Sequence, residues 1–129
     1  MNIKKFEDLE SWKQARQLAN NIYNLSKTDK FSKDFGLRAQ IRRASVSILS
    51  NIAEGYERDG NQELMQFLSI AKGSCGEVRS QLYIAGDQGY ISKDDCEQMI
   101  DNCKKLSIML HKFIEYLKTA PYKGNKYKK

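Results

Sequence analysis

The chain has 129 residues, of which 40% are hydrophobic and 29% are charged, with a formal net charge of +6 and a pI near 9.2. This length fits one domain that buries a core of its own, and the composition is ordinary for a soluble protein. No segment approaches the roughly 20 apolar residues that cross a bilayer, and the start lacks the apolar run of a signal peptide. We therefore expect a cytoplasmic protein with no membrane partner.

The pattern of residues predicts an all-α protein. The single proline, Pro121, lies near the end, so no earlier segment is barred from a helix, and no run of alternating β-branched residues predicts a sheet. We expect the first helix over about residues 8–27 and a polar connection over 28–33 that contains Phe31. The apolar stripe of this first helix has helical spacing and consists of Trp12, Ala15, Ala19 and Ile22.

A second helix is predicted over about 34–57, with Asp34 as its N-cap. Its apolar and small residues recur three or four positions apart, which is the period of one helix face. These residues are Ile41, Ala44, Ile48, Ile52 and Gly55. Further apolar residues widen the stripe, so we expect this helix to contact more than one neighbour. They are Val46, Leu49, Ala53 and Tyr56.

The third helix is predicted over about 61–88, with Gly60 as its N-cap and Gly89 as the residue that ends it. Gly73 and Gly76 lie inside this helix, where each glycine costs about 1 kcal/mol relative to alanine. Because glycine lowers helix stability at these positions, we expect the packing of the helix to require it there. We predict that another helix backbone approaches closely at these two positions.

The fourth helix is predicted over about 93–118, with Ser92 as N-cap and Asp95 as the acid of a capping box. Four long helices with short connections predict a single up-down-up-down antiparallel four-helix bundle over residues 1–119, followed by a basic flexible tail over 120–129. The stripe of the fourth helix alternates in steps of three and four, as in helices that cross at a shallow angle. It comprises Cys96, Met99, Cys103, Leu106, Leu110, Phe113 and Leu117.

Three stretches carry a family resemblance: Ile41–Ile48 (IRRASVSI), Ser50–Tyr56 (SNIAEGY) and Phe67–Ala71 (FLSIA) with Gly73–Ser74. With them the chain resembles the four-helix-bundle proteins named for intervening sequences in bacterial 23S ribosomal RNA genes. The resemblance covers nearly the whole chain, although relatives often carry proline at the position of Leu49. It implies the same bundle and assembly into closed rings of five subunits. Relatives that accompany diversity-generating retroelements resemble basic, ring-shaped partners of a reverse transcriptase and its RNA.

The sequence offers little for catalysis, so we predict no enzyme activity, no metal site and no cofactor. Its single histidine, His111, lies within a helix and has no cluster of metal ligands around it. Asp94 and Asp95 are explained as acids at the start of a helix, where they favour its dipole. The three cysteines lack CxxC spacing, and we interpret them as small core residues. They are Cys75, Cys96 and Cys103.

Basic residues are the main functional candidates. On the second helix, Arg38 and Arg42 share a face, and Arg43 is adjacent to them; Arg43 has the alternative of an ion pair within or between subunits. Lys72 adds to this set. Tyr122 and Tyr127 of the tail could stack on bases, although a tail that only aids solubility is an equal alternative. The lysines beyond the last acid are Lys118, Lys123, Lys126, Lys128 and Lys129.

The motif around the second helix is interpreted as structural and as part of assembly. Asn51 can donate a hydrogen bond to a neighbouring helix, and Gly55 permits close approach. Base reading by Asn51 would need an exposed position, which its place beside two buried isoleucines argues against. The motif residues are Ser47, Asn51, Glu54, Gly55 and Tyr56.

Two functional hypotheses follow from these features. The first is a non-catalytic homo-oligomer, expected to be a pentamer, whose basic surface binds nucleic acid, with RNA favoured over DNA. A protein that processes nucleic acid would be a further partner. The second is a structural scaffold that docks another protein and has no nucleic-acid role. Loss or retention of function when the tail charge is neutralised would separate the two.

Overall fold

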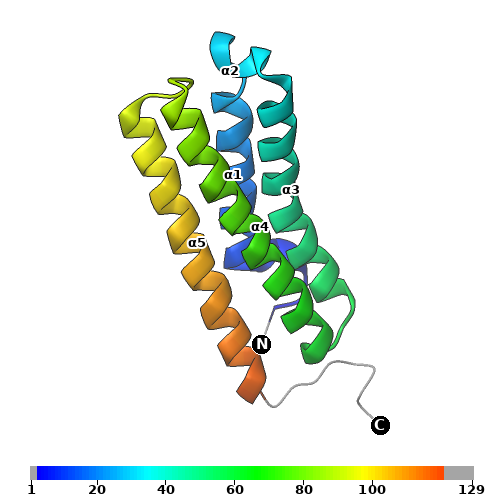
Figure 1. Ribbon diagram of the computed structural model, residues 1–129. Helices are drawn as coiled ribbons and strands as arrows, with labels where there is room; N and C mark the ends of the chain where they lie inside the picture. Colours follow the sequence, from blue (N-terminus) through cyan, green and yellow to red (C-terminus); the bar gives the residue numbers. More distant parts are fainter. Residues whose placement is uncertain (1–2, 121–129) are drawn as a thin grey trace.

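The computed structural model describes residues 3–120, and over this range the protein is all-helical with no β-strand (Figure 1). Four of its helices are long and form a bundle, which confirms the all-α class. The predicted tail lies outside the described residues except for Ala120. The elements are a 3₁₀ turn, η1 (Phe6–Asp8), and the helices α1 (Glu10–Leu25), α2 (Asp29–Lys33), α3 (Phe35–Glu57), α4 (Asn61–Asp87) and α5 (Lys93–Thr119).

Helix α1 buries the apolar face that its sequence predicts, with Ala15, Leu18 and Ile22 in the core. It begins two residues later than expected because η1 precedes it. The Phe6 ring of η1 packs edge-on against Trp12 with 5.3 Å between the ring centres. This contact holds the start of α1 against the preceding turn.

The connection after α1 corrects one prediction. Residues 28–33 were expected to form a polar connection, but residues 29–33 form the short helix α2. Phe31 is the physical reason, since its ring is 1% exposed and stacks on Tyr90 at 5.4 Å. Burying this ring fixes the backbone around it. The segment is therefore part of the core and closes one end of the bundle (Figure 1).

Helix α3 follows directly, and its predicted N-cap is confirmed. Asp34 Oδ1 accepts a hydrogen bond from the backbone N–H of Leu37 at 3.1 Å, and Asp34 Oδ2 accepts another from the Tyr90 hydroxyl at 2.9 Å. The second bond raises the pKa of Tyr90 above its usual value, because it is made to a carboxylate. The predicted stripe of α3 is buried throughout. It consists of Ile41, Ala44, Ile48, Ile52 and Gly55.

Helix α4 begins after Gly60, as predicted, and ends at a turn in which Gly89 has φ +74°. The backbone N–H of Tyr90 bonds to Ala85 O at 2.9 Å and that of Gly89 to Gly86 O at 3.0 Å. These two bonds form a Schellman motif, which satisfies the last carbonyl groups of the helix. Glycine fits the left-handed position without steric cost.

The prediction of a close helix crossing at Gly73 and Gly76 is wrong for this chain. Both glycines are exposed, and a Cβ built on either would meet no atom within 4 Å. The close approach occurs instead at Gly55, where a Cβ would lie 2.7 Å from the Cβ of Phe67 in α4. Glycine in α3 is what allows these two helices to pack together.

Helix α5 has the predicted cap, since Ser92 Oγ accepts the backbone N–H of Asp95 at 3.0 Å. Its predicted stripe is buried, apart from Cys96 and Phe113, which are half-buried. Around the bundle, α3 packs most extensively on α4 and α4 on α5, whereas the contact between α1 and α5 is the thinnest. One core cluster runs through all four long helices and α2.

Matched alanine substitutions test the packing at Gly55. Gly55→Ala should lower the free energy of unfolding by about 1–3 kcal/mol, because the added methyl group overlaps Phe67. Gly73→Ala should raise it by about 0.5–1 kcal/mol, because an exposed helix interior gains from losing glycine. Urea denaturation followed by far-UV circular dichroism measures both. The assignment of the helix contact fails if the two variants shift stability in the same direction.

Candidate nucleic-acid interface

Arg42 is held in place at the C-terminal end of α1. Its Nε donates to Ser26 Oγ at 2.8 Å, and a terminal nitrogen donates to Tyr23 O at 3.5 Å. The guanidinium carbon lies 4.6 Å from the centre of the Tyr23 ring, within the range of a cation–π contact. The arginine thus neutralises carbonyl groups at the negative end of the α1 dipole.

Arg38 repeats this arrangement one helical turn earlier. A terminal nitrogen donates to Ser32 O in α2 at 2.8 Å, and the guanidinium carbon lies 5.0 Å from the centre of the Phe35 ring. Both arginines therefore connect α3 to the segment before it. A guanidinium group has five N–H donors, and these bonds use only one or two of them. The remaining donors of Arg38 and Arg42 form no hydrogen bond within residues 3–120.

The first half of the chain, which contains these arginines, is rich in positive charge. Residues 11–53 contain eight Lys or Arg and two Asp or Glu, a net charge of +6 that equals the formal charge of the whole protein. The remaining residues of the chain include fourteen Lys or Arg and fourteen Asp or Glu, so their charges cancel. Lys27, Lys30 and Lys33 are exposed and form no ion pair within residues 3–120. One of the two acids, Asp34, is engaged by Leu37 and Tyr90.

The structure separates Arg43 from Arg38 and Arg42. Arg43 lines a groove of about 410 Å³ between α3 and α4, together with Glu77 and Gln81. Within the described part of the chain, neither Arg43 nor Glu77 forms an ion pair. The side-chain oxygen of Gln81 is buried and accepts no hydrogen bond from the residues that the structure describes. Arg43 therefore belongs to a different surface from the other two arginines.

The other predicted basic residues also lie apart. Lys72 is half-buried on α4. Lys118 lies in the last turn of α5, where its Nζ is 2.7 Å from Glu115 Oε2; this bond lowers the pKa of the Glu115 carboxyl. The last four predicted lysines lie outside the described residues. They are Lys123, Lys126, Lys128 and Lys129.

The predicted structural motif connects α3 with α4 through hydroxyl groups. Asn51 Nδ2 donates to Ser47 O at 2.8 Å and to Ser47 Oγ at 3.0 Å, so its bonds stay within its own helix. Ser47 Oγ in turn bonds to Ser74 Oγ of α4 at 2.9 Å. Asn51 thus reaches the neighbouring helix only through Ser47. The half-buried amide and the two hydroxyl groups satisfy one another at the helix contact.

The remaining motif residues act at the lower end of α3 in Figure 1. Glu54 forms an exposed ion pair with Arg58 at 2.8 Å, which contributes little to stability. The Tyr56 hydroxyl donates to Ile3 O at 2.8 Å and ties the N-terminal segment to α3. Burial is the main cause of the raised pKa of Tyr56.

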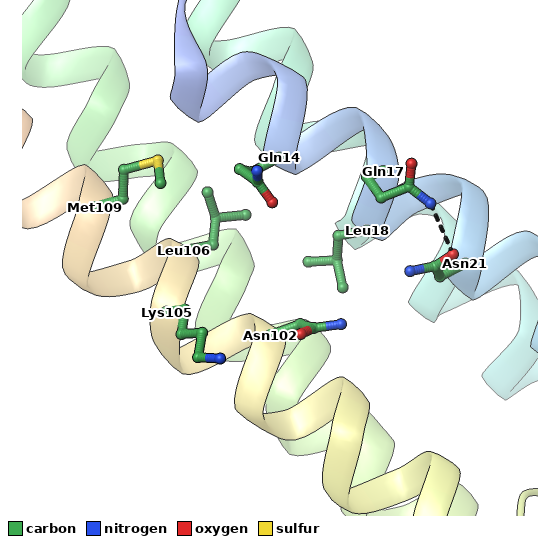
Figure 2. Close-up of a pocket in the computed structure, with 8 residues that line it drawn as sticks. All are labelled: Gln14, Gln17, Leu18, Asn21, Asn102, Lys105, Leu106 and Met109. Atoms are coloured by element: carbon green, nitrogen blue, oxygen red, sulfur yellow. Dashed lines mark hydrogen bonds between the residues drawn. The ribbon is translucent and has the colours of Figure 1, made fainter.

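A second feature of the surface is the seam between α1 and α5, which Figure 2 shows. Cavities of about 100 and 210 Å³ lie along it, and both have Asn21 in their walls. Gln17 Nε2 donates to Asn21 Oδ1 at 3.1 Å on α1, and Gln98 Nε2 donates to Asn102 Oδ1 at 3.1 Å on α5. Each of these amide pairs lies within one helix, consistent with the thin contact between the two helices.

The thiols are part of the core. Cys75 Sγ donates to Cys103 O at 3.1 Å, and both cysteines are at most 1% exposed. The pKa of Cys103 is raised by its hydrogen bond with Cys75 and by burial. Across residues 3–120, no group of three or more His, Cys, Asp or Glu is placed to hold a metal ion. Over the same range no helix has the length and apolar character needed to cross a membrane.

The fold and charge define a small, basic helical-bundle protein. The model of the 23S rRNA-intervening sequence protein family matches residues 7–112. The chain therefore belongs to this family, which confirms the resemblance seen in its sequence.

Solved structures agree with the fold. The protein is similar to the crystal structure of a protein of unknown function from the S23 ribosomal protein family of Bacteroides thetaiotaomicron. The TM-score is 0.75 at 24% identity, and the similarity covers 81% of this chain and 98% of the other. At this identity the similarity establishes the fold alone. No curated protein matches the chain.

Sequence reasoning missed the two aromatic rings of the basic region, Tyr23 and Phe35, and the three lysines between them in sequence. Their proximity depends on the turn formed by α2, which was not expected. Counting charges over successive segments of the sequence would have pointed to this region, because residues 35–53 contain three arginines and no acid.

Asn51→Leu tests the interpretation of the motif. Loss of its donor to Ser47 should lower the free energy of unfolding by about 1 kcal/mol, or disturb self-association, before it changes affinity for RNA. Ser50→Leu, at the exposed neighbouring position, is the control. Urea denaturation, sedimentation and RNA binding are measured on both. A well-folded and normally assembled Asn51→Leu protein that no longer binds RNA contradicts a structural role.

Proposed function

We propose that this protein is a non-catalytic, cytoplasmic homo-oligomer that binds nucleic acid, with RNA favoured, through the basic region formed by α1, α2 and α3. The observation that carries the proposal is the charge at the end of the bundle that contains α2, where residues 23–42 hold five Lys or Arg and two Asp or Glu. Phosphate groups are the natural partners of such a region, because each neutralised phosphate releases counterions.

The geometry of the arginines supports this proposal. Arg38 and Arg42 are fixed by backbone and hydroxyl oxygens on one side, which limits the side-chain entropy that they lose on binding. Lys27, Lys30 and Lys33 lie in the connecting segment beside them and are exposed. Fixed guanidinium groups flanked by mobile ammonium groups suit a polyanion whose phosphates follow one another along a chain.

The proposal includes an up-down-up-down course for the four long helices. Asn61 Nδ2 at the start of α4 donates to Leu117 O near the end of α5 at 3.4 Å. At the opposite ends of these helices, Cys96 Sγ donates to Leu82 O at 3.5 Å. Both contacts are those of helices that run in opposite directions.

Self-association is supported by the outward side of α4. Three large apolar side chains there, Ile70, Tyr83 and Ile84, are 52%, 51% and 48% exposed. Ile70 and Ile84 also lie seven residues on either side of Glu77, which places them beside the groove that contains Arg43. A second copy of the chain would cover this surface.

The family resemblance supplies the expected number of five copies in a closed ring. Such a ring would present five basic regions to one nucleic acid, and linked sites bind more tightly than one site alone. A weak basic region would then be sufficient for function. A protein that processes nucleic acid remains a proposed further partner.

A scaffold without a nucleic-acid role is the second candidate, and the same apolar side of α4 favours it. Apolar residues exposed along one side of a helix mark contacts between proteins as readily as contacts between copies. On this hypothesis the positive charge has no ligand. Measurements of RNA binding and of oligomeric state separate the two functions.

Neutralising the basic region should weaken RNA binding and its dependence on salt. We expect the triple variant Lys27→Gln, Lys30→Gln, Lys33→Gln to bind structured RNA less tightly. The slope of log K against log salt should become shallower by about 2, since each contact with a single strand contributes about 0.7. Fluorescence anisotropy across a salt series gives both quantities.

The matched control removes three charges from α5, as Lys104→Gln, Lys105→Gln, Lys112→Gln, and should keep the wild-type slope. A chain ending at Ala120 measures the contribution of the predicted tail, which we expect to add further phosphate contacts. Equal losses in the two triple variants would contradict a localised site. No binding at low salt would remove the nucleic-acid role and leave the scaffold.

Charge placed on the outward side of α4 should abolish self-association. The double variant Ile70→Glu, Ile84→Glu introduces two carboxylates into the proposed subunit contact, where their desolvation is costly. Sedimentation velocity should show smaller particles with unchanged helix content. Ile108→Glu on α5 is the control, because Ile108 is also exposed, at 56%. A wild-type protein that sediments as a monomer would refute the proposed assembly.

A further inference from the structure

Phe35 is the most exposed large hydrophobic residue of the described chain, at 68%. It is the first residue of α3 and follows α2 directly, so it lies where the basic region is densest. No fold requirement explains a phenyl ring at this position, since the cap of α3 is made by Asp34. An exposed aromatic ring beside fixed cations is the arrangement on which proteins stack the bases of single-stranded nucleic acids.

The surroundings of the ring are ordered in advance. The Arg38 guanidinium lies over the ring at 5.0 Å and is anchored by Ser32 O at 2.8 Å. Tyr23, which is 38% exposed, has the same relation to Arg42 at 4.6 Å. Arg38 and Arg42 are four residues apart, so the two stacked pairs are separated by about 6 Å along α3. The chain therefore displays two aromatic rings, each with its own fixed cation.

We propose that Phe35 and Tyr23 stack on unpaired bases, so that the RNA bound by this region is single-stranded. The inference rests on the proposed function, because the lysines and arginines must first hold the phosphate backbone. Every base has a π-face, so stacking needs no particular sequence. In a duplex these faces are covered by neighbouring base pairs, whereas loops and single strands expose them.

The charges around the rings fit this ligand. Lys27, Lys30 and Lys33 extend from the segment between the two rings in sequence, and each provides a mobile cation for a phosphate. The Asp34 carboxylate accepts bonds from Leu37 and Tyr90, which orient it within the bundle end. A strand that crosses this end of the bundle would place its phosphates at the lysines and its bases at the rings. This division of contacts is typical of proteins that bind single strands without sequence preference.

The test compares one unstructured single-stranded RNA with the duplex that it forms with its complement. The full chain should bind the single strand more tightly than the duplex in fluorescence anisotropy. Phe35→Ala should weaken binding of the single strand by about 5- to 150-fold, the loss of one base stack, and leave the duplex unchanged. Phe35→Trp should restore affinity. The salt slope should be the same in all three proteins, because no charge is removed.

Controls assign each result to one cause. Ile108→Ala removes another exposed apolar side chain, 56% exposed, from α5 and should bind both RNAs as the wild type does. If both RNAs bind with a steep salt dependence but Phe35→Ala changes neither, the stacking inference is overturned and phosphate binding stands. If neither RNA binds, the proposed function itself fails. If Phe35→Ala dissociates the oligomer, Phe35 is a subunit contact, which also overturns the inference.

Discussion

The close packing of α3 on α4 is the constraint on which the rest of the bundle depends. It requires a residue without a Cβ at position 55, because Phe67 of α4 occupies the space that a methyl group would fill. At this distance backbone and side-chain polar groups lose water, and the Ser47–Ser74 hydrogen bond with the Asn51 amide supplies their partners. Steric fit and polar satisfaction are therefore achieved by one short motif, Ser47 to Gly55.

The packing of α3 on α4 also determines which surfaces the other sides of α3 form. Successive residues on a helix are about 100° apart, so Arg42 and Arg43 diverge although they are adjacent in sequence. Arg42 turns towards α1 and bonds with Ser26, whereas Arg43 lines the groove beside α4. One helix thus serves a basic surface on one side and a proposed subunit surface on the other. The two roles do not compete for the same arginine.

The long helices could be predicted from sequence because the apolar period persists over many turns, and Asp34 and Ser92 mark two of their starts. The short helix α2 could not, since five residues carry too little period and its helicity follows from burying Phe31 against Tyr90. The packing role of each glycine could not be predicted either. Gly55 and Gly73 both lie inside helices, and only the position of α4 shows which of them contacts a neighbouring helix. The site could not be predicted for the same reason, because the contact of Arg42 with Tyr23 and that of Arg38 with Ser32 depend on how the chain turns at α2.

A ligand responds to the charge within a Debye length of about 8–10 Å, and not to the net charge of the chain. The lysines beyond Glu115 are offset in the total by acids elsewhere outside residues 11–53, so the sum of +6 hides two distinct basic segments. In the segment over residues 11–53, Arg38 and Arg42 are held against aromatic rings and by oxygen atoms of α2 and of the C-terminal end of α1. Cations held in this way have fixed positions and orientations. The proposed mode of binding therefore depends on the charges of this region and not on the overall pI.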